Sequence, residues 1–153
     1  TFIYAGLRRE ELCWLTWNDL DTVSQTPTLR ICSKSIDGES WLPKTKKNRT
    51  VPISPKLLNV LKGLKREHSI WVFPSPDGCR WDPDNLSHRL ARLMKDAGVN
   101  WNILVLRHTF GSQLARKGVS LLKIAQLMGN SPLIATKHYI RLVPEEMHKD
   151  VEF

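Results

Sequence analysis

Three residues in this chain have the types and surroundings needed to act on a phosphate group. Arg107 lies within the apolar segment ILVLRHTF, where a buried guanidinium needs a negatively charged partner. A carboxylate in a structural salt bridge would meet that need, and so would a phosphate bound through two parallel hydrogen bonds. Arg8 stands near the start of a helical pattern, with Glu11 three residues later. Tyr139 lies among basic residues in KHYIRL, where it could pack in the core, contact DNA or act as a nucleophile.

The composition favours a polyanionic partner, with nucleic acid the leading candidate. The 153 residues include 23 Lys plus Arg against 15 Asp plus Glu, a formal net charge of +8. Charge alone does not decide this, because many basic domains are merely soluble. No segment reaches the roughly 20 apolar residues that a membrane span needs, so no membrane partner is expected.

The cysteines argue against a metal centre or a disulfide framework. Cys13, Cys32 and Cys79 are scattered and odd in number, and no Cys/His spacing is typical of a zinc site. We therefore expect no metal and no cofactor. A reducing, cytoplasmic compartment fits this cysteine usage best.

The periodicity predicts an α+β domain that is mainly α, with a small sheet near the N-terminus. Alternation in residues 28–34 and 41–54 predicts a three-stranded antiparallel sheet within residues 28–53, with a basic turn from Lys44 to Arg49. Helices are predicted over residues 6–21, from Ser54-Pro55 onward, over 82–98, 103–118 and 121–129, and from Ser131-Pro132 through Tyr139.

The predicted helix over residues 82–98 has two distinct faces. Its apolar residues are expected to form a buried stripe of Leu86, Leu90, Leu93 and Ala97. The opposite face is polar and basic, which suits phosphates or a DNA groove, and consists of Asn85, His88, Arg89 and Arg92.

Four ordered blocks, spread over almost the whole chain, resemble the catalytic domain of the tyrosine recombinases, the phage integrase family. They are AGLRREELCWLTWNDLD, PKTKKNRTVPI, LRHTFGSQLARKGVSLLKIAQLMGNS and HYIRL. Each block alone is a weak signal, whereas four in the right order at plausible separations are a strong one. By position in these blocks, the resemblance implies a set of catalytic residues comprising Arg8, Lys44, Arg107, Asn130 and Tyr139.

The resemblance also implies a reaction. Members of the family cut DNA by attack of the tyrosine oxygen on a backbone phosphate, which leaves a 3′-phosphotyrosyl link and a free 5′-hydroxyl. The covalent bond conserves the energy needed for rejoining, so neither ATP nor a metal is required. Two arginines would hold the charge that builds on the phosphate oxygens, and a lysine on a mobile hairpin would protonate the leaving oxygen.

Fold, partners and location follow from the same resemblance as expectations. Residues 1–153 would be the catalytic domain, with residues 144–153 a C-terminal tail and a separate N-terminal DNA-clamping domain outside this sequence. The partner would be double-stranded DNA in the cytoplasm of a prokaryotic cell, at the nucleoid. The full-length protein would act as a homotetramer, and the isolated domain would be a monomer. Further phosphate contacts are expected from Lys46, Lys47, Arg49, Arg89 and Arg92.

The sequence departs from the family pattern at two positions. Leu104 stands three residues before Arg107, where the family usually has a histidine, and it cannot transfer a proton. Asn130 stands where a histidine or tryptophan is typical, but it can still donate a hydrogen bond to a phosphate oxygen. We expect His108 to be structural, because its side chain should leave the helix on a different face from Arg107. Restoring a histidine at residue 104 is expected to raise cleavage.

Other functions remain open at this point. A type IB topoisomerase would use the same tyrosine chemistry to relax supercoils. Residues 118–142 also read as a helix-turn-helix that binds DNA without cutting it, although this leaves Arg8 and the lysine hairpin unexplained. A degenerate recombinase fold that binds DNA but no longer cleaves it would account for Leu104.

Overall fold

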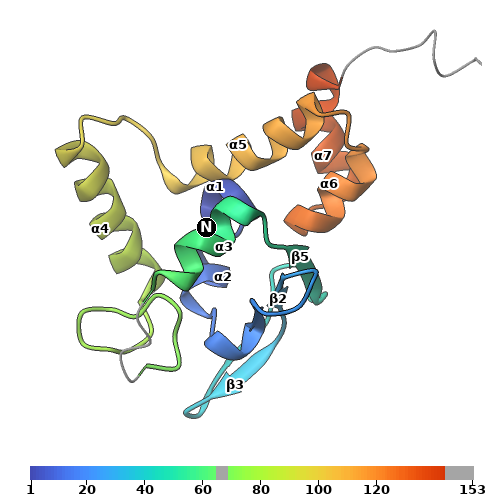
Figure 1. The fold of residues 1–153 in the computed structure, drawn as a ribbon. Coiled ribbons are helices and arrows are strands. Elements are labelled where there is room, and N and C mark those ends of the chain that lie inside the picture. Colours follow the sequence, from blue (N-terminus) through green and yellow to red (C-terminus); the bar gives the residue numbers. More distant parts are fainter. Residues whose placement is uncertain (65–68, 144–153) are drawn as a thin grey trace, which may run out of the picture.

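The computed structural model describes residues 1–64 and 69–143, and these form helices beside a small three-stranded antiparallel sheet and a two-stranded hairpin (Figure 1). The helices are α1 (Phe2–Ala5), α2 (Arg9–Cys13), α3 (Pro55–Lys62), α4 (Pro83–Asp96), α5 (Ile103–Arg116), α6 (Leu121–Met128) and α7 (Pro132–Tyr139), with short 3₁₀ turns at Trp17–Asp19 and Ile140–Leu142. The strands are β1 (Leu20–Asp21), β2 (Thr28–Ile31), β3 (Lys34–Ile36), β4 (Glu39–Trp41) and β5 (Arg49–Pro52). The expected fold class is confirmed.

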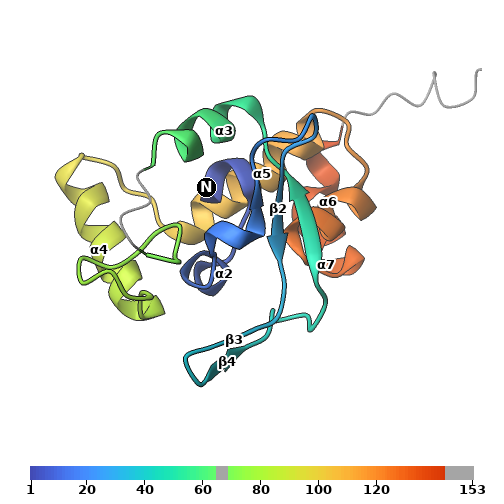
Figure 2. The ribbon, with the colours of Figure 1, turned by 60° about the horizontal axis from the view of Figure 1, so that its bottom comes forward.

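The three-stranded sheet has the order β1-β2-β5, and both pairs are antiparallel. Leu29 on β2 lies opposite Val51 on β5, and both side chains are buried. The prediction placed all three strands within residues 28–53, but the third strand is β1. The intervening residues pair locally instead, because Asp37 and Gly38 both adopt positive φ and close a tight β3–β4 hairpin. This hairpin projects from the body of the domain (Figure 2).

The prediction of one helix over residues 6–21 was wrong. Gly6 adopts a left-handed conformation that ends α1, and α2 is a short helix that ends at Cys13. Asp19 then accepts hydrogen bonds from the backbone N–H and the hydroxyl of Thr16, which starts a 3₁₀ turn. This side-chain cap competes with continuation of the helix. Arg8 therefore lies at the start of a short helix, next to a sharp bend.

Helix α5 joins two hydrophobic cores. One core gathers buried residues of α1, α2, the sheet and α3, and the other packs α5, α6 and α7 together. Helix α5 contacts α1 as well as α6 and α7, and it runs between α4 and the α6–α7 pair (Figure 1). Helix α6 also contacts β5. The start of α2, the middle of α5 and the end of α6 are thereby brought together.

Helix α4 stands apart from the rest of the domain (Figure 1), and its apolar face is only partly covered. Of the predicted stripe, Leu86 is buried and Leu90 is half-buried, whereas Leu93 is 46% exposed and Ala97 is exposed. That stripe was therefore wrong at its C-terminal end. Helix α4 packs against the short helix α2, and of its leucines Leu86 and Leu90 join the core whereas Leu93 does not.

In the described part of the chain, none of the helices has both the length and the apolar character of a membrane span. The predicted C-terminal tail, residues 144–153, lies outside the described residues.

Candidate active site

A cleft of about 900 Å³ brings most of the predicted catalytic residues together. Arg8 at the start of α2, Lys44 in the β4–β5 turn, Arg107 on α5 and Asn130 in the α6–α7 corner all line it. Four separate elements therefore contribute polar side chains to one surface. Tyr139 is not among the lining residues, but its neighbours His108 and His138 are.

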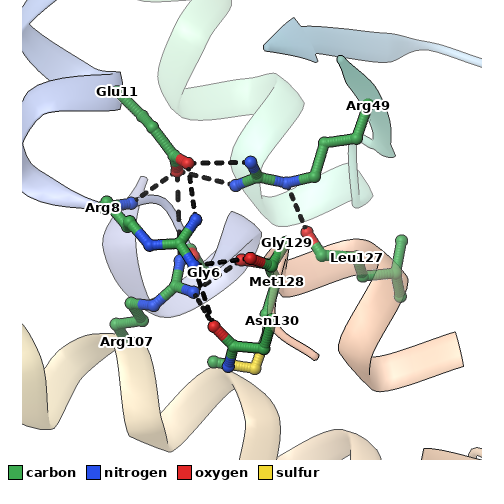
Figure 3. A network of polar contacts seen from close by, with 9 residues as sticks. All are labelled: Gly6, Arg8, Glu11, Arg49, Arg107, Leu127, Met128, Gly129 and Asn130. Carbon is green, nitrogen blue, oxygen red and sulfur yellow. Dashed lines mark hydrogen bonds and ion pairs between the residues drawn. The ribbon is translucent and has the colours of Figure 1, made fainter. Parts of the chain in front are cut away.

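The carboxylate of Glu11 organises the arginines on one side of this cleft (Figure 3). Glu11 is 1% exposed at its side chain and accepts hydrogen bonds from the backbone N–H of Arg8 at 2.7 Å and from Arg8 Nη1 at 2.9 Å. Arg49 donates to both carboxylate oxygens, at 2.7 and 2.6 Å. Burial acts to raise the pKa of Glu11, but the contacts with Arg49 and Arg8 outweigh it and hold the pKa below its usual value. The carboxylate is therefore ionised at neutral pH.

Arg107 is held mainly by backbone carbonyls. It donates to the carbonyl oxygens of Gly6 and of Met128, the latter at 2.5 Å, while the nearest oxygen of Glu11 is 3.9 Å away. Burial, together with the positive charge of Arg8, lowers the pKa of Arg107 to about 10, so the guanidinium stays charged at neutral pH. A rigidly placed cation that is not fully neutralised by a carboxylate is suited to bind an anion in the cleft.

Asn130 connects the two arginines. Its Oδ1 atom accepts a hydrogen bond from Arg8 Nη2 at 2.9 Å and another from Arg107 Nη2 at 3.0 Å. Guanidinium groups only donate, so the amide oxygen must face them and the Nδ2 group must point elsewhere. Within residues 1–64 and 69–143 this Nδ2 group has no acceptor, so it can donate to a ligand in the cleft.

Gly129 permits this close approach of the guanidiniums. It ends α6 in a left-handed conformation, with φ of 63°. A Cβ atom there would lie 2.7 Å from Arg49 Nη1 and 3.1 Å from Arg8 Nη1. The carbonyl oxygen of Gly129 also accepts a hydrogen bond from Arg8, at 2.5 Å.

Arg49 lies inside the cluster and away from the basic turn where we expected it to contact DNA. Its side chain is 8% exposed, and besides the pair with Glu11 it donates to the carbonyl oxygen of Leu127 at 2.9 Å. The strand pattern carried a signal for this placement. Arg49 is two residues before the buried Val51 on β5, and residues two apart on a strand share a face.

The β4–β5 turn places three lysines at the surface. Lys44, Lys46 and Lys47 are exposed, and Lys44 lines the cleft. Buried Pro43 anchors the start of this turn. The preceding strand is held by Trp41, whose ring stacks on that of Trp14 at 6.0 Å.

The remaining predicted DNA contacts are on α4. Arg89 and Arg92 are exposed but do not line the cleft, whereas His88 on the same helix does. Most of the α4 lining is apolar or small, contributed by Ser87, Leu90, Ala91 and Met94.

Tyr139 is 1% exposed, and its hydroxyl lies 2.9 Å from Nδ1 of His108. Burial raises the pKa of Tyr139, and the nearby charge of Arg107 acts in the opposite direction. We expected His108 to be structural; in the structure its side chain lines the cleft and its Nδ1 atom contacts the hydroxyl of Tyr139, and its role stays a prediction. The direction of this side chain depends on how α5 and α7 pack, so the sequence of α5 alone could not reveal the contact.

The absence of a side chain at Gly111 makes room for the ring of Tyr139. A Cβ atom at Gly111 would lie 2.4 Å from Cζ of Tyr139 and 2.8 Å from Sδ of Met128. Gly111→Ala is expected to lower the free energy of unfolding by about 1–3 kcal/mol, as overpacking does, and to displace the hydroxyl from His108. Urea unfolding checks the first effect, with Gln113→Ala on the exposed side of α5 as the control. Equal stability of the two variants would contradict the placement of the ring.

The charged groups of the site do not form a metal-binding set. Among the residues described by the structure, no three His, Cys, Asp or Glu side chains are grouped so that they could hold a metal ion. Glu11 is already engaged by arginines.

Comparisons with known proteins match almost the whole length of this chain. The model of the phage integrase family matches residues 2–146. A XerC-like tyrosine recombinase of Caldanaerobacter subterraneus subsp. tengcongensis is 28% identical, over 97% of this chain and 46% of its own length. Tyrosine recombinase XerA of Pyrococcus furiosus is 29% identical, over 97% of this chain and 50% of its own. The chain thus spans about half the length of the curated relatives it matches.

Solved structures show the same fold. A XerA recombinase superposes with a TM-score of 0.74 at 23% identity, covering 97% of this chain and 53% of that protein. The Tn1549 transposon integrase, solved in complex with a circular intermediate DNA, gives a TM-score of 0.79 at 19% identity, covering 99% of this chain and 55% of that protein.

Proposed function

The chain belongs to the phage integrase family, and on this premise we propose that it cuts and rejoins double-stranded DNA at specific sites as a tyrosine recombinase. One observation carries the proposal. Two guanidiniums from distant parts of the chain, Arg8 and Arg107, donate to the same amide oxygen of Asn130 at the surface of one cleft. Such an arrangement keeps two cations in place before any anion arrives, which is the arrangement that stabilises charge developing on a phosphate.

Each residue then has a role in one transesterification. Arg8 and Arg107 hold the non-bridging oxygens of a DNA phosphate, and Asn130 donates its Nδ2 hydrogen to the same group. Tyr139 attacks the phosphorus, which forms a 3′-phosphotyrosyl bond and breaks the bond to the 5′ oxygen. Lys44, exposed at the edge of the cleft, gives that oxygen its proton. The reverse reaction rejoins the strand.

The tyrosine must approach the phosphate for this reaction. Tyr139 is buried over Gly111 and does not line the cleft, although the neighbouring His108 and His138 do. We propose that bound DNA stabilises a position of the end of α7 in which the phenol reaches the phosphate. Arg49 serves as a positioning residue, since it holds Glu11 and the end of α6 in place.

The DNA backbone is bound by exposed cations outside the cluster. We assign this role to Lys46 and Lys47 on the β4–β5 turn and to Arg89 and Arg92 on α4. Each phosphate contact releases counterions, so binding weakens as salt rises.

The two turn lysines allow a quantitative check of this binding mode. In the double variant Lys46→Ala/Lys47→Ala, the plot of log affinity against log salt is expected to become shallower by about 2, one for each lost phosphate contact. Fluorescence anisotropy at several salt concentrations measures the slope. Lys117→Ala, exposed at the end of α5 and not lining the cleft, is the matched control. An unchanged slope in the double variant would place the DNA elsewhere.

Assembly and location are part of the same proposal. We propose that residues 1–153 act as the catalytic domain, alone a monomer, and that the whole protein assembles as a homotetramer on DNA in the cytoplasm, at the nucleoid. The helix-turn-helix alternative finds no support in the arrangement of α6 and α7. The corner between them holds Asn130, which is bound to Arg8 and Arg107 from outside that helix pair.

Covalent capture on DNA tests the proposed reaction. The substrate is a library of nicked duplexes with random sequence around the nick. Cleavage near the nick releases a short strand that diffuses away, so the strand cannot be rejoined and the adduct is trapped. The parent chain and Tyr4→Phe are expected to form a protein–DNA adduct on a denaturing gel, and Tyr139→Phe is expected to form none; Tyr4 and Tyr139 are the only tyrosines of the chain. DNA binding without any adduct would contradict cleavage and support a DNA-binding role.

A further inference from the structure

The hydroxyl of Tyr139 has one hydrogen-bond partner in the described part of the chain, the imidazole of His108. The distance from Nδ1 to the hydroxyl oxygen is 2.9 Å. His108 lies on α5 and Tyr139 is the last residue of α7, so packing between these helices creates the contact. His108 is half-buried and lines the cleft, and it therefore touches both the hydroxyl and the space where a phosphate would bind.

Residue 104 cannot supply a proton acceptor at this place. Leu104 is 60% exposed and lines the cleft one helical turn before His108. Residues four apart on a helix lie on the same face, so residues 104 and 108 present their side chains to the same region. The imidazole of His108 therefore lies one helical turn from residue 104, where the family usually has a histidine.

We propose that His108 accepts the proton of the Tyr139 hydroxyl when the tyrosine attacks DNA, in place of a histidine at residue 104. This role rests on the proposed function. The tyrosine O–H bond breaks as the O–P bond forms, and the proton moves to Nδ1 of His108. The bond between phosphorus and the 5′ oxygen breaks, and Lys44 protonates that oxygen.

The surroundings of His108 keep its Nδ1 atom available. Burial, the nearby His138 and the charge of Arg107 together lower the pKa of His108 below its ordinary value. The titratable groups that face it are Tyr139 and His138 from α7, the latter with a ring centroid 5.0 Å away, and Arg107 from its own helix. The imidazole is therefore neutral at neutral pH, and with its proton on Nε2 it can accept at Nδ1.

The sign of the pH effect follows directly. A neutral imidazole accepts the proton and a protonated one does not. The cleavage rate of the parent chain should be constant around neutral pH and should fall as the pH drops through the pKa of His108, which lies below about 6.5.

Leu104→His provides a second, independent test. If an imidazole on this face accepts the proton, Leu104→His should raise cleavage more in the His108→Asn background than in the parent chain. Two groups that perform one task give such non-additive effects. An equal rise in the cleavage rate in both backgrounds would indicate that residues 104 and 108 act separately. It would overturn the proposal that His108 takes the place of a histidine at residue 104.

The deciding experiment compares pH–rate profiles of single-turnover cleavage on a captured nicked duplex. His108→Asn keeps an acceptor oxygen at the Nδ1 position but does not titrate near neutral pH. We expect its rate to fall by about 10² or more and its decline at acid pH to disappear. His138→Asn is the matched control and should retain that decline, moved to higher pH because His138 lowers the pKa of His108. Added imidazole should partly restore His108→Ala, which keeps the test valid if the asparagine variant fails to fold.

The possible failures are distinguishable. A cleavage rate of His108→Asn within threefold of the parent, or an unchanged decline at acid pH, would overturn the role of His108 and leave the recombinase proposal intact. A threefold change in rate is roughly 0.7 kcal/mol at ~298 K, which is below the contribution of a general base. A parent chain that binds DNA and forms no adduct at any pH would overturn both proposals.

Discussion

Arg107→Ala is expected to reduce single-turnover DNA cleavage by about 10²–10³, the loss typical when one preorganised donor is removed from a site of developing charge. Three acceptors, the carbonyl oxygens of Gly6 and Met128 and the amide oxygen of Asn130, fix this guanidinium in the cleft. Arg107→Lys should lose nearly as much, because an ammonium keeps the charge but cannot reproduce the planar fork that reaches several acceptors.

The comparison variant for this effect is on the same helix. Arg116→Ala removes an exposed arginine at the C-terminal end of α5 and should leave the cleavage rate unchanged. The reaction is run at saturating DNA and quenched at successive times, and the amount of covalent adduct gives the rate. Saturation separates catalysis from binding. A rate of Arg107→Ala close to that of the parent would show that this arginine only supports the structure, and a parent-like rate of Arg107→Lys would show that the charge suffices without the planar fork.

Glu11→Ala is expected to lower the free energy of unfolding by about 3–5 kcal/mol, the range seen when one partner of a buried ion pair is removed. The carboxylate of Glu11 contacts Arg8 and Arg49 directly and lies 3.9 Å from Arg107. Its loss leaves several cations close together without a counter-charge. Urea unfolding measures the change, and Glu10→Ala, exposed on the same helix, should have little effect.

The pH dependence of this stability has a definite sign. The pKa of Glu11 is held below its usual value in the folded chain, so its contribution is present above the unfolded pKa of about 4.3 and is lost as the pH falls below it. The difference in stability between the parent and Glu11→Gln should therefore be largest near neutral pH and should shrink in acid. A constant difference across this range would mean that the carboxylate is not ionised in the folded chain.

Much of the site could be predicted from the sequence because each of its residues lies in a short segment with a recognisable sequence pattern. Arg8, Lys44, Arg107 and Asn130 lie in recognisable blocks, and the structure confirms that all four line one cleft. Their roles in catalysis stay predictions. The helices from α3 to α7 begin close to the predicted residues. In the structure, Ser, Asp or Asn side chains at their N-termini accept hydrogen bonds from the first turn.

The parts that the sequence did not reveal depend on contacts between distant elements. The contact between His108 and Tyr139 arises from how α5 packs on α7. Arg49 resembled its basic neighbours on the turn, yet Glu11 and the carbonyl oxygen of Leu127 bind it inside the domain. The division of residues 6–21 into separate short elements depended on a cap between Thr16 and Asp19, which competed with a helical pattern of leucines.

During cleavage the phenol of Tyr139 is predicted to become covalently joined to a 3′ phosphate of DNA. The most direct measurement is mass spectrometry of the captured adduct after digestion with protease and nuclease. We predict that the phosphoryl-nucleotide mass lies on the peptide that contains Tyr139, and that the released strand carries a free 5′-hydroxyl. Attachment at Tyr4 or at a serine, or a 5′-phosphate on the released strand, would contradict a role of Tyr139 as the nucleophile.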